Sequence, residues 1–215
     1  MDQGARLDEE AALQAYAANG WLALAVTLAI QIFTAAASTA PAVLAPEIAR
    51  SFALPAGLAG VFVGIINAGG MAASLAAGAF IGRYGPIRVS QIGVLLCAAG
   101  IGLVAFVPAA QPLLLPLGAI LIGVGYAPIT PASSDLLVRT TPPARMAVTF
   151  SVKQTGVPVG GALAGATLPA LALALGWRLS VLALALVGLC IAAMAQWTRR
   201  SLDGERSAGG PYSSA

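Results

Sequence analysis

Two ionisable side chains lie inside long apolar runs of this sequence. Lys153, with Gln154 beside it, lies about two turns into one run, and Asp135, followed one turn later by Arg139, lies near the end of another. A charge in the hydrocarbon of a membrane is costly and is usually paired or functional. Two interpretations follow. Both groups snorkel to the membrane surface or pair structurally, Asp135 with Lys153 or with an arginine of the 82–88 loop; or they contact a substrate or carry a coupled proton.

Serine residues next to these ionisable side chains raise the possibility of hydrolytic chemistry. Ser133, Ser134 and Asp135 are consecutive, but the sequence has no histidine to act as a base or as a metal ligand. A Ser–Lys arrangement with Lys153 is the remaining way to activate a serine. The two cysteines are isolated in apolar runs, which argues against a disulfide framework or a thiolate metal site. We therefore expect no enzyme activity, no cofactor and no metal.

The composition indicates that these residues belong to a membrane domain. Of 215 residues, 59% are hydrophobic and 9% are charged, whereas soluble domains are about 25% charged. Ten of the nineteen charges lie in residues 1–20 and 198–215. We predict a membrane domain over 21–197, a polar N-terminal tail over 1–20, and a polar, disordered tail over 198–215. The net charge of +3 comes from scattered arginines and does not indicate nucleic-acid binding.

The apolar runs predict an all-α, polytopic fold with six transmembrane helices. Each run is long enough to cross a bilayer, which takes about 20 residues; the runs are 21–45, 55–81, 89–108, 112–137, 147–174 and 177–197. Eight arginines fall in the tails and the even-numbered loops, and two fall in the odd-numbered loops. The positive-inside rule therefore places both termini in the cytoplasm. The preference for arginine over lysine, with much alanine and glycine, is typical of a GC-rich bacterial genome, so we expect a bacterial plasma membrane.

Polar side chains form one stripe on each of two predicted helices, the first and the fourth. The stripes consist of Thr27, Gln31, Thr34 and Ser38, and of Tyr126, Thr130, Ser133 and Ser134. For any one hydroxyl, a bond to its own backbone or to a neighbouring helix is the simpler explanation. Two stripes three helices apart favour a lined cavity. We predict that helices one and four line a solute pathway, together with Asn67 and Gln154, whereas the featureless helices three and six face lipid.

Small residues dominate the second and fifth predicted helices. Gly156, Gly160, Gly161 and Gly165 are spaced for close helix packing, and Pro158 among them should bend the helix. The segment 69–78, GGMAASLAAG, is echoed by 160–170, GGALAGATLPA. This echo predicts two inverted three-helix repeats, an arrangement found in transporters, which bind solute at the interface between repeats.

The segment 78–88, GAFIGRYGPIR, resembles the loop signature of the major facilitator superfamily. That signature is a glycine, three residues, an aspartate, a basic residue, any residue, a glycine and two basic residues. Gly78, Arg83 and Gly85 match it, Gly82 replaces the aspartate, and Arg88 comes one place late. The resemblance implies that this loop latches two halves of a transporter on the cytoplasmic side.

Two further segments strengthen the resemblance, which covers residues 20–200. Similarity to bacterial members that include cyanate- and nitrate-transporter-like proteins is found in the segment 151–165, SVKQTGVPVGGALAG, and in the GWR that follows at 176–178. The segment 125–134, GYAPITPASS, fits the same group. Members of the superfamily usually have twelve spans in two six-helix bundles. The resemblance implies a central cavity lined by helices one and four.

These observations favour a secondary transporter, or half of one, for a small polar or anionic solute. No ATP-binding loop occurs in the sequence, so an ion gradient or the solute's own gradient would drive transport. A single bundle would leave polar stripes facing lipid, so we expect a second six-helix bundle, from the same or another chain, as a partner. The alternative is a truncated or non-transporting membrane fragment that associates with such a bundle.

Overall fold

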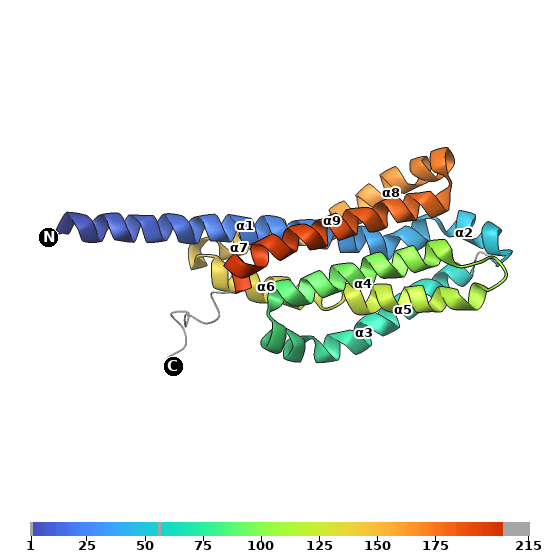
Figure 1. The fold of residues 1–215 in the computed structure, drawn as a ribbon, viewed down its shortest axis with the longest axis horizontal. Helices are drawn as coiled ribbons and strands as arrows, with labels where there is room; N and C mark the ends of the chain where they lie inside the picture. The colour runs from blue at the N-terminus through green and yellow to red at the C-terminus, as the bar shows by residue number, and fades with distance from the viewer. Residues whose placement is uncertain (1, 56, 204–215) are drawn as a thin grey trace.

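The computed structural model describes residues 2–55 and 57–203, which form a bundle of helices (Figure 1). Eleven helical elements follow one another over this range: α1 (Asp2–Val43), α2 (Ala45–Phe52), α3 (Leu58–Tyr84), α4 (Pro86–Phe106), η1 (Pro112–Leu114), α5 (Leu115–Tyr126), α6 (Ile129–Thr140), η2 (Pro143–Arg145), α7 (Met146–Gln154), α8 (Gly156–Leu175) and α9 (Trp177–Asp203). The prediction of an all-α fold is confirmed.

Six segments of the described chain are long and apolar enough to cross a membrane. They are Gly20–Val43, Leu58–Tyr84, Pro86–Phe106, Pro112–Thr140, Pro143–Leu175 and Trp177–Arg199. The number of spans is as predicted, and the second span ends at Tyr84, three residues later than predicted. The predicted tails partly continue these helices, because α1 begins at Asp2 and α9 ends at Asp203. The rest of the predicted C-terminal tail, 204–215, lies outside the described residues.

Two glycines make the sharpest connections between consecutive spans. Gly85 joins α3 to α4 and Gly176 joins α8 to α9, with φ values of 92° and 84°. These values lie in the region that glycine adopts without a steric penalty. In both turns the glycine N–H donates to the carbonyl four residues earlier, Ile81 O at 3.0 Å and Ala172 O at 2.9 Å. A single residue therefore reverses the chain between adjacent antiparallel spans.

The two turns belong to an internal repeat. The same 91 residues separate Gly85 from Gly176 and the glycine pair at 69–70 from the pair at 160–161. In the first unit the pair packs on α5, where a Cβ added to Gly69 would lie 3.3 Å from Ile120 O; in the second, Gly160 packs against Ile32 of α1. Each pair thus contacts the first span of the other unit. Because each unit has three spans, an odd number, the second unit crosses the membrane in the opposite direction to the first, as predicted.

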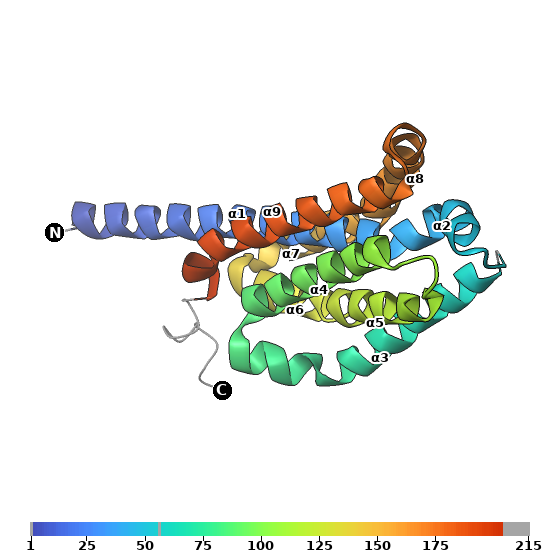
Figure 2. The same ribbon diagram turned by 45° about the vertical axis from the view of Figure 1, so that its right-hand side comes forward.

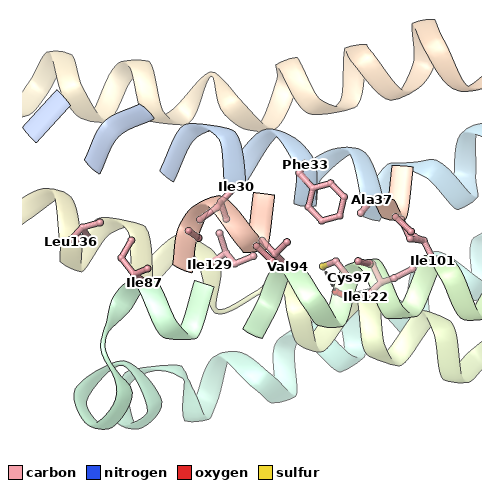
Figure 3. Close-up of a cluster of buried hydrophobic side chains, with 14 of the residues drawn as sticks. Ile30, Phe33, Ala37, Ile87, Val94, Cys97, Ile101, Ile122, Ile129 and Leu136 are labelled. Carbon is pink, nitrogen blue, oxygen red and sulfur yellow. Dashed lines mark hydrogen bonds between the residues drawn. The ribbon is translucent and has the colours of Figure 1, made fainter. Parts of the chain in front are cut away.

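The packing of the spans reflects the same internal repeat. The spans pack along one another as α1 with α8, α3 with α5, and α4 with α9. Figures 1 and 2 show α3 and α8 toward opposite edges of the bundle, with α4 between α5 and α9. The apolar core lies between α1, α4, α5 and α6, where Phe33, Val94 and Cys97 are buried (Figure 3). The Cys97 thiol donates to Ile122 O at 3.5 Å.

The prediction that the third span stands outside the bundle is wrong. In its most apolar window 61% of the residues are buried, against 11% for the second span. Only a narrow apolar face of α4, which includes Ile92 and Leu95, is exposed. The absence of polar side chains does not separate a lipid-facing helix from one packed among apolar helices, because lipid tails are as apolar as leucine.

A cluster around Arg178 joins three helices at the end of the bundle away from the start of α1. The Arg178 guanidinium donates to Ala105 O and, at 3.1 Å, to Val107 O at the end of α4. It also lies over the rings of Trp177 and Phe52, 4.9 and 5.8 Å from their centroids. The Trp177 indole donates to Ser51 Oγ at 2.7 Å. The cluster therefore fixes α2 and α9 to the end of α4, and we refer to it as the Arg178 clamp.

Candidate functional site

The polar stripe of α1 lies inside the bundle. Thr27, Gln31 and Thr34 are each at most 1% exposed. The Thr27 hydroxyl donates to Ala23 O at 2.7 Å and the Thr34 hydroxyl to Ile30 O at 2.9 Å. Ser38, which is half-buried, donates to Ala35 O at 2.9 Å. Because Thr27, Gln31 and Thr34 are buried within one bundle, the prediction that a single bundle leaves this stripe facing lipid is wrong.

The fourth and fifth spans are interrupted where they approach each other. The regular helical hydrogen bonding of the fourth span is interrupted between α5 and α6 at Ala127 and Pro128, and that of the fifth between α7 and α8 at Thr155. All three residues keep helical φ and ψ values, so the spans are kinked and continue through these points. Proline has no N–H to donate to the carbonyl four residues earlier, which explains a break one turn before Pro131 and Pro158. The predicted bend at Pro158 is therefore present as an interruption at Thr155.

Lys153 lies at the end of α7 beside this interruption, and its side chain is only 1% exposed. The ammonium donates to Thr130 O at 3.2 Å and to Ser134 Oγ at 3.1 Å, both on α6. The Phe150 ring centroid lies 5.9 Å from Nζ. Among the described residues, no carboxylate lies within ion-pair distance of Lys153. The positive charge is held by neutral oxygens and one aromatic ring.

Thr130 is the point at which three helices meet. Its carbonyl oxygen accepts from the Ser133 and Ser134 hydroxyls at 3.0 and 2.9 Å as well as from Lys153. Its hydroxyl accepts a 3.5 Å hydrogen bond from Gln31 Nε2 of α1. The Gln31 Oε1 atom is buried without a hydrogen-bond partner. We call Gln31, Thr130, Ser134 and Lys153 the Lys153 site.

The Lys153 site lies just beneath an exposed surface of the bundle. Thr130 and Gln154 are exposed and Ser134 is half-buried. A lysine ammonium has three donors, and its two hydrogen bonds here leave the third without an acceptor in the part of the chain that the structure describes. The site therefore combines an unused donor on Lys153 with an unused acceptor on Gln31.

Asp135 does not pair with Lys153. Its Oδ1 atom accepts from Arg139 Nη2 at 2.9 Å and from Nε at 3.3 Å, one turn along α6. The predicted pairs, with Lys153 or with an arginine of the 82–88 loop, are not formed. The Oδ2 atom of Asp135 is buried without a partner. The pair is local to α6 and lies next to the Lys153 site without entering it.

Ser134 and Lys153 are close enough for the Ser–Lys arrangement considered from the sequence, but the donors point the wrong way. A nucleophilic serine gives its proton to a base. Here the ammonium donates to Ser134 Oγ, and Ser134 in turn donates to Thr130 O. The ammonium bond joins α7 to α6, and the Ser134 hydroxyl gives its proton to Thr130 O and not to Lys153.

Two other predicted pathway residues, Tyr126 and Asn67, make no hydrogen bond to the Lys153 site among the described residues. Tyr126 is half-buried at the end of α5. Asn67 is exposed on α3 and donates to Val63 O of its own helix at 2.9 Å. Within the described residues, no three Cys, Asp or Glu side chains lie close enough together to hold a metal ion.

The predicted packing glycines divide into two groups. A Cβ at Gly156 would lie 3.1 Å from the Gln31 Cβ and Cγ atoms, and a Cβ at Gly160 would collide with Ile32 O. By contrast, Gly161 would meet only Thr39 Oγ1 at 3.9 Å, and Gly165 would meet nothing within 4 Å. Within the described bundle, Gly156 and Gly160 therefore pack against α1, whereas Gly165 faces open space.

The predicted loop motif has structural contacts at both ends. Arg83 lies over the Tyr84 ring, 5.5 Å from its centroid, and Gly78 faces open space. Arg88 donates to Gln91 Oε1 at 2.9 Å, and Gln91 Nε2 donates to Ala192 O of α9 at 2.9 Å. Sequence analysis missed Gln91, which is the only amide in the third predicted span.

A sequence profile described as Major Facilitator Superfamily matches residues 27–213, which is most of the chain. A search of curated proteins finds no match.

Proposed function

Because the chain belongs to the major facilitator superfamily, we propose that it is a secondary transporter that moves a small polar or anionic solute by alternating access. The six apolar spans and the two inverted units support this proposal. An ion gradient or the solute's own gradient would drive the movement.

The Lys153 site carries the proposal. A buried charge without a counter-charge is expensive, and in a membrane segment it indicates a substrate or ion pathway. A small anion would supply the acceptor that the third ammonium donor lacks. A solute group that can also donate would satisfy Gln31 Oε1. The likeness of residues 151–165 to cyanate- and nitrate-transporter-like proteins supports a small monovalent anion.

The two interrupted spans supply the means of movement. At both interruptions the backbone keeps helical φ and ψ values and a proline one turn later removes one hydrogen bond of the helix, so each span can bend there. Lys153 and Thr130 lie within three residues of the two interruptions. An anion that takes the ammonium from Thr130 O would release α7 from α6, which couples binding to a change in the angle between them.

We further propose that a second six-helix bundle, from another copy or another chain, covers α3. Gly60, Gly64 and Gly78 lie at helical spacing on α3, and a Cβ added at any of them meets open space. The polar Asn67 follows the same spacing and is exposed. Small-residue stripes are typical of helix contacts in membranes. In a Cys190→Ala background, Gly64→Cys should form an oxidised dimer if a second copy is the partner.

The proposed orientation places both termini in the cytoplasm of a bacterial cell. The arginine distribution supports it. Figure 1 also shows that α1 begins and α9 ends toward the same end of the bundle. Labelling of single cysteines placed next to Arg83 and Arg50 from the two sides of intact cells would test it.

The test of function is flux into vesicles that contain the purified protein. We expect uptake of one or more of nitrate, cyanate and formate, and no uptake of uncharged urea. Lys153→Met should reduce anion uptake about 30-fold or more, because losing one charge of a buried contact costs about 2–5 kcal/mol. Lys153→Arg should retain part of the activity, and Arg50→Gln, far from the site, should retain all of it. Equal uptake by Lys153→Met and the wild type would contradict the assignment.

A further inference from the structure

A cavity of about 260 Å³ lies between the start of the first span and the connection from the fourth to the fifth span. Its walls include Trp21 and Leu24 of α1, Thr141 and Arg145 of the connection, and Val148 of α7. The first span begins at Gly20, the fourth ends at Thr140 and the fifth begins at Pro143. The cavity therefore opens at one surface of the membrane, where lipid headgroups lie.

The polar groups of this cavity suit an anion. Thr141 is 5% exposed, and its hydroxyl oxygen is buried without a hydrogen-bond partner. Arg145 is exposed, and among the described side chains no carboxylate pairs with it. A guanidinium and a hydroxyl are the donors that bind phosphate oxygens in many proteins. Thr149 provides a second hydroxyl on the same wall.

The apolar rim distinguishes a lipid from a free anion. Trp21 and Val148 are 63% and 66% exposed, and Leu22 beside Trp21 is also exposed. Tryptophan is enriched at the membrane interface, where its ring packs against the glycerol and upper acyl region of lipids. A free phosphate would use only Arg145 and Thr141, whereas a phospholipid would also cover these apolar side chains.

We propose that this cavity binds the headgroup phosphate of an anionic phospholipid, with Arg145 and Thr141 as its donors and Trp21 against its glycerol backbone. Basic pockets between transmembrane helices are known to bind anionic headgroups. The site lies at the start of α7, eight residues from Lys153, and is separate from the solute site. It depends on membrane insertion of the bundle and does not depend on the transported solute.

Native mass spectrometry of the purified protein tests this proposal. The protein is delipidated and titrated with phosphatidylglycerol or with phosphatidylcholine of the same acyl chains. We expect one phosphatidylglycerol to be retained at the lowest concentrations, with affinity about tenfold weaker for Arg145→Gln, because a charge-assisted hydrogen bond is lost. Thr141→Val should weaken binding by a smaller factor. Arg83→Gln, a charge change at the same membrane surface, should leave it unchanged.

Any one of three results would overturn the proposal. The first is that Arg145→Gln retains phosphatidylglycerol as well as the wild type does, and the second is that phosphatidylcholine binds as tightly as phosphatidylglycerol. The third is that inorganic phosphate at millimolar concentration displaces the retained lipid. The last result would assign the cavity to a free anion. The melting temperature of each variant without lipid shows whether a lost lipid reflects a lost fold.

Discussion

Lys153 and Arg178 are two cations held by backbone carbonyl oxygens, and they differ in burial and in the groups that surround them. At Arg178 the guanidinium binds Ala105 O and Val107 O and is covered by two aromatic rings. At Lys153 the ammonium binds Thr130 O and Ser134 Oγ beside one ring, and its third donor has no acceptor among the described residues. At one end of the bundle the cation joins three helices, whereas at the other a buried cation keeps a donor for a further ligand.

The residue types match these two roles. The Arg178 Nη1 atom donates to both carbonyls, and the planar guanidinium lies over two aromatic rings, which suits a clamp. Lysine is a point charge on a flexible stem and can change partner by rotation about its side-chain bonds. The comparison therefore predicts that Arg178 contributes to stability and that Lys153 contributes to function.

Removing the clamp should have the largest effect on stability. Arg178→Met leaves Ala105 O and Val107 O at the end of α4 without their donor and removes two ring contacts. We expect the free energy of unfolding to fall by about 2–3 kcal/mol, the usual range for hydrogen bonds to a charged group. Equilibrium unfolding in mixed detergent micelles measures this change. An unchanged midpoint would show that the clamp does not stabilise the bundle.

A methyl group at Gly160 should also destabilise the bundle, by packing alone. Gly160→Ala places a Cβ against Ile32 O of α1, where backbone must shift, at a cost of about 1–3 kcal/mol. Gly165→Ala, one turn further along α8, meets open space and should stabilise slightly, because alanine is the better helix former. Equal effects of the two variants would contradict the close approach of α8 to α1.

Lys153→Met should leave stability unchanged or raise it by up to about 1 kcal/mol. The Ser133 and Ser134 hydroxyls still donate to Thr130 O in this variant, so no partner is left unsatisfied. Replacing a buried charge by an apolar side chain of similar size is often neutral or stabilising. If Lys153→Met lowered the free energy of unfolding as much as Arg178→Met does, Lys153 would also be a stabilising residue, and the proposed difference between the two cations would be contradicted.

The smallest effect is expected at the exposed ion pair of α2. Arg50 Nη2 lies 3.2 Å from Glu47 Oε1, with the Arg50 side chain 75% exposed. Exposed pairs contribute about 0–1 kcal/mol. Glu47→Gln should therefore change the unfolding midpoint by no more than the error of the measurement. A larger loss would mean that α2 is held by this pair as well as by the clamp.

The sequence predicted the spans and the repeat better than it predicted burial. Long apolar runs and proline breaks are local properties, so six spans and the interruption near Pro158 could be identified. The burial of α4 could not, because lipid and an apolar helix accept the same side chains. The similarity of the two glycine-rich segments has a structural basis, because Gly69 and Gly160 occupy equivalent positions in the repeat. Gly69 packs against α5 and Gly160 against α1, each the first span of the other unit.

The candidate site was predicted residue by residue, but its connections were not. Gln31, Thr130, Ser134 and Lys153 were all identified as polar residues in apolar runs. Their meeting at one carbonyl depends on the relative rotation of three helices, which no single helix encodes. The same limit explains why Asp135 was assigned to distant partners, although Arg139 one turn away was sufficient.

The most direct test of the account is whether a small anion stabilises the protein through Lys153. Unfolding of the purified wild type and Lys153→Met is followed in detergent with nitrate, cyanate or formate at increasing concentration and constant ionic strength. We predict that at least one anion raises the wild-type melting temperature in a saturable way and has no effect on Lys153→Met. The same saturable rise in both proteins would contradict the role of Lys153 as the anion-binding charge.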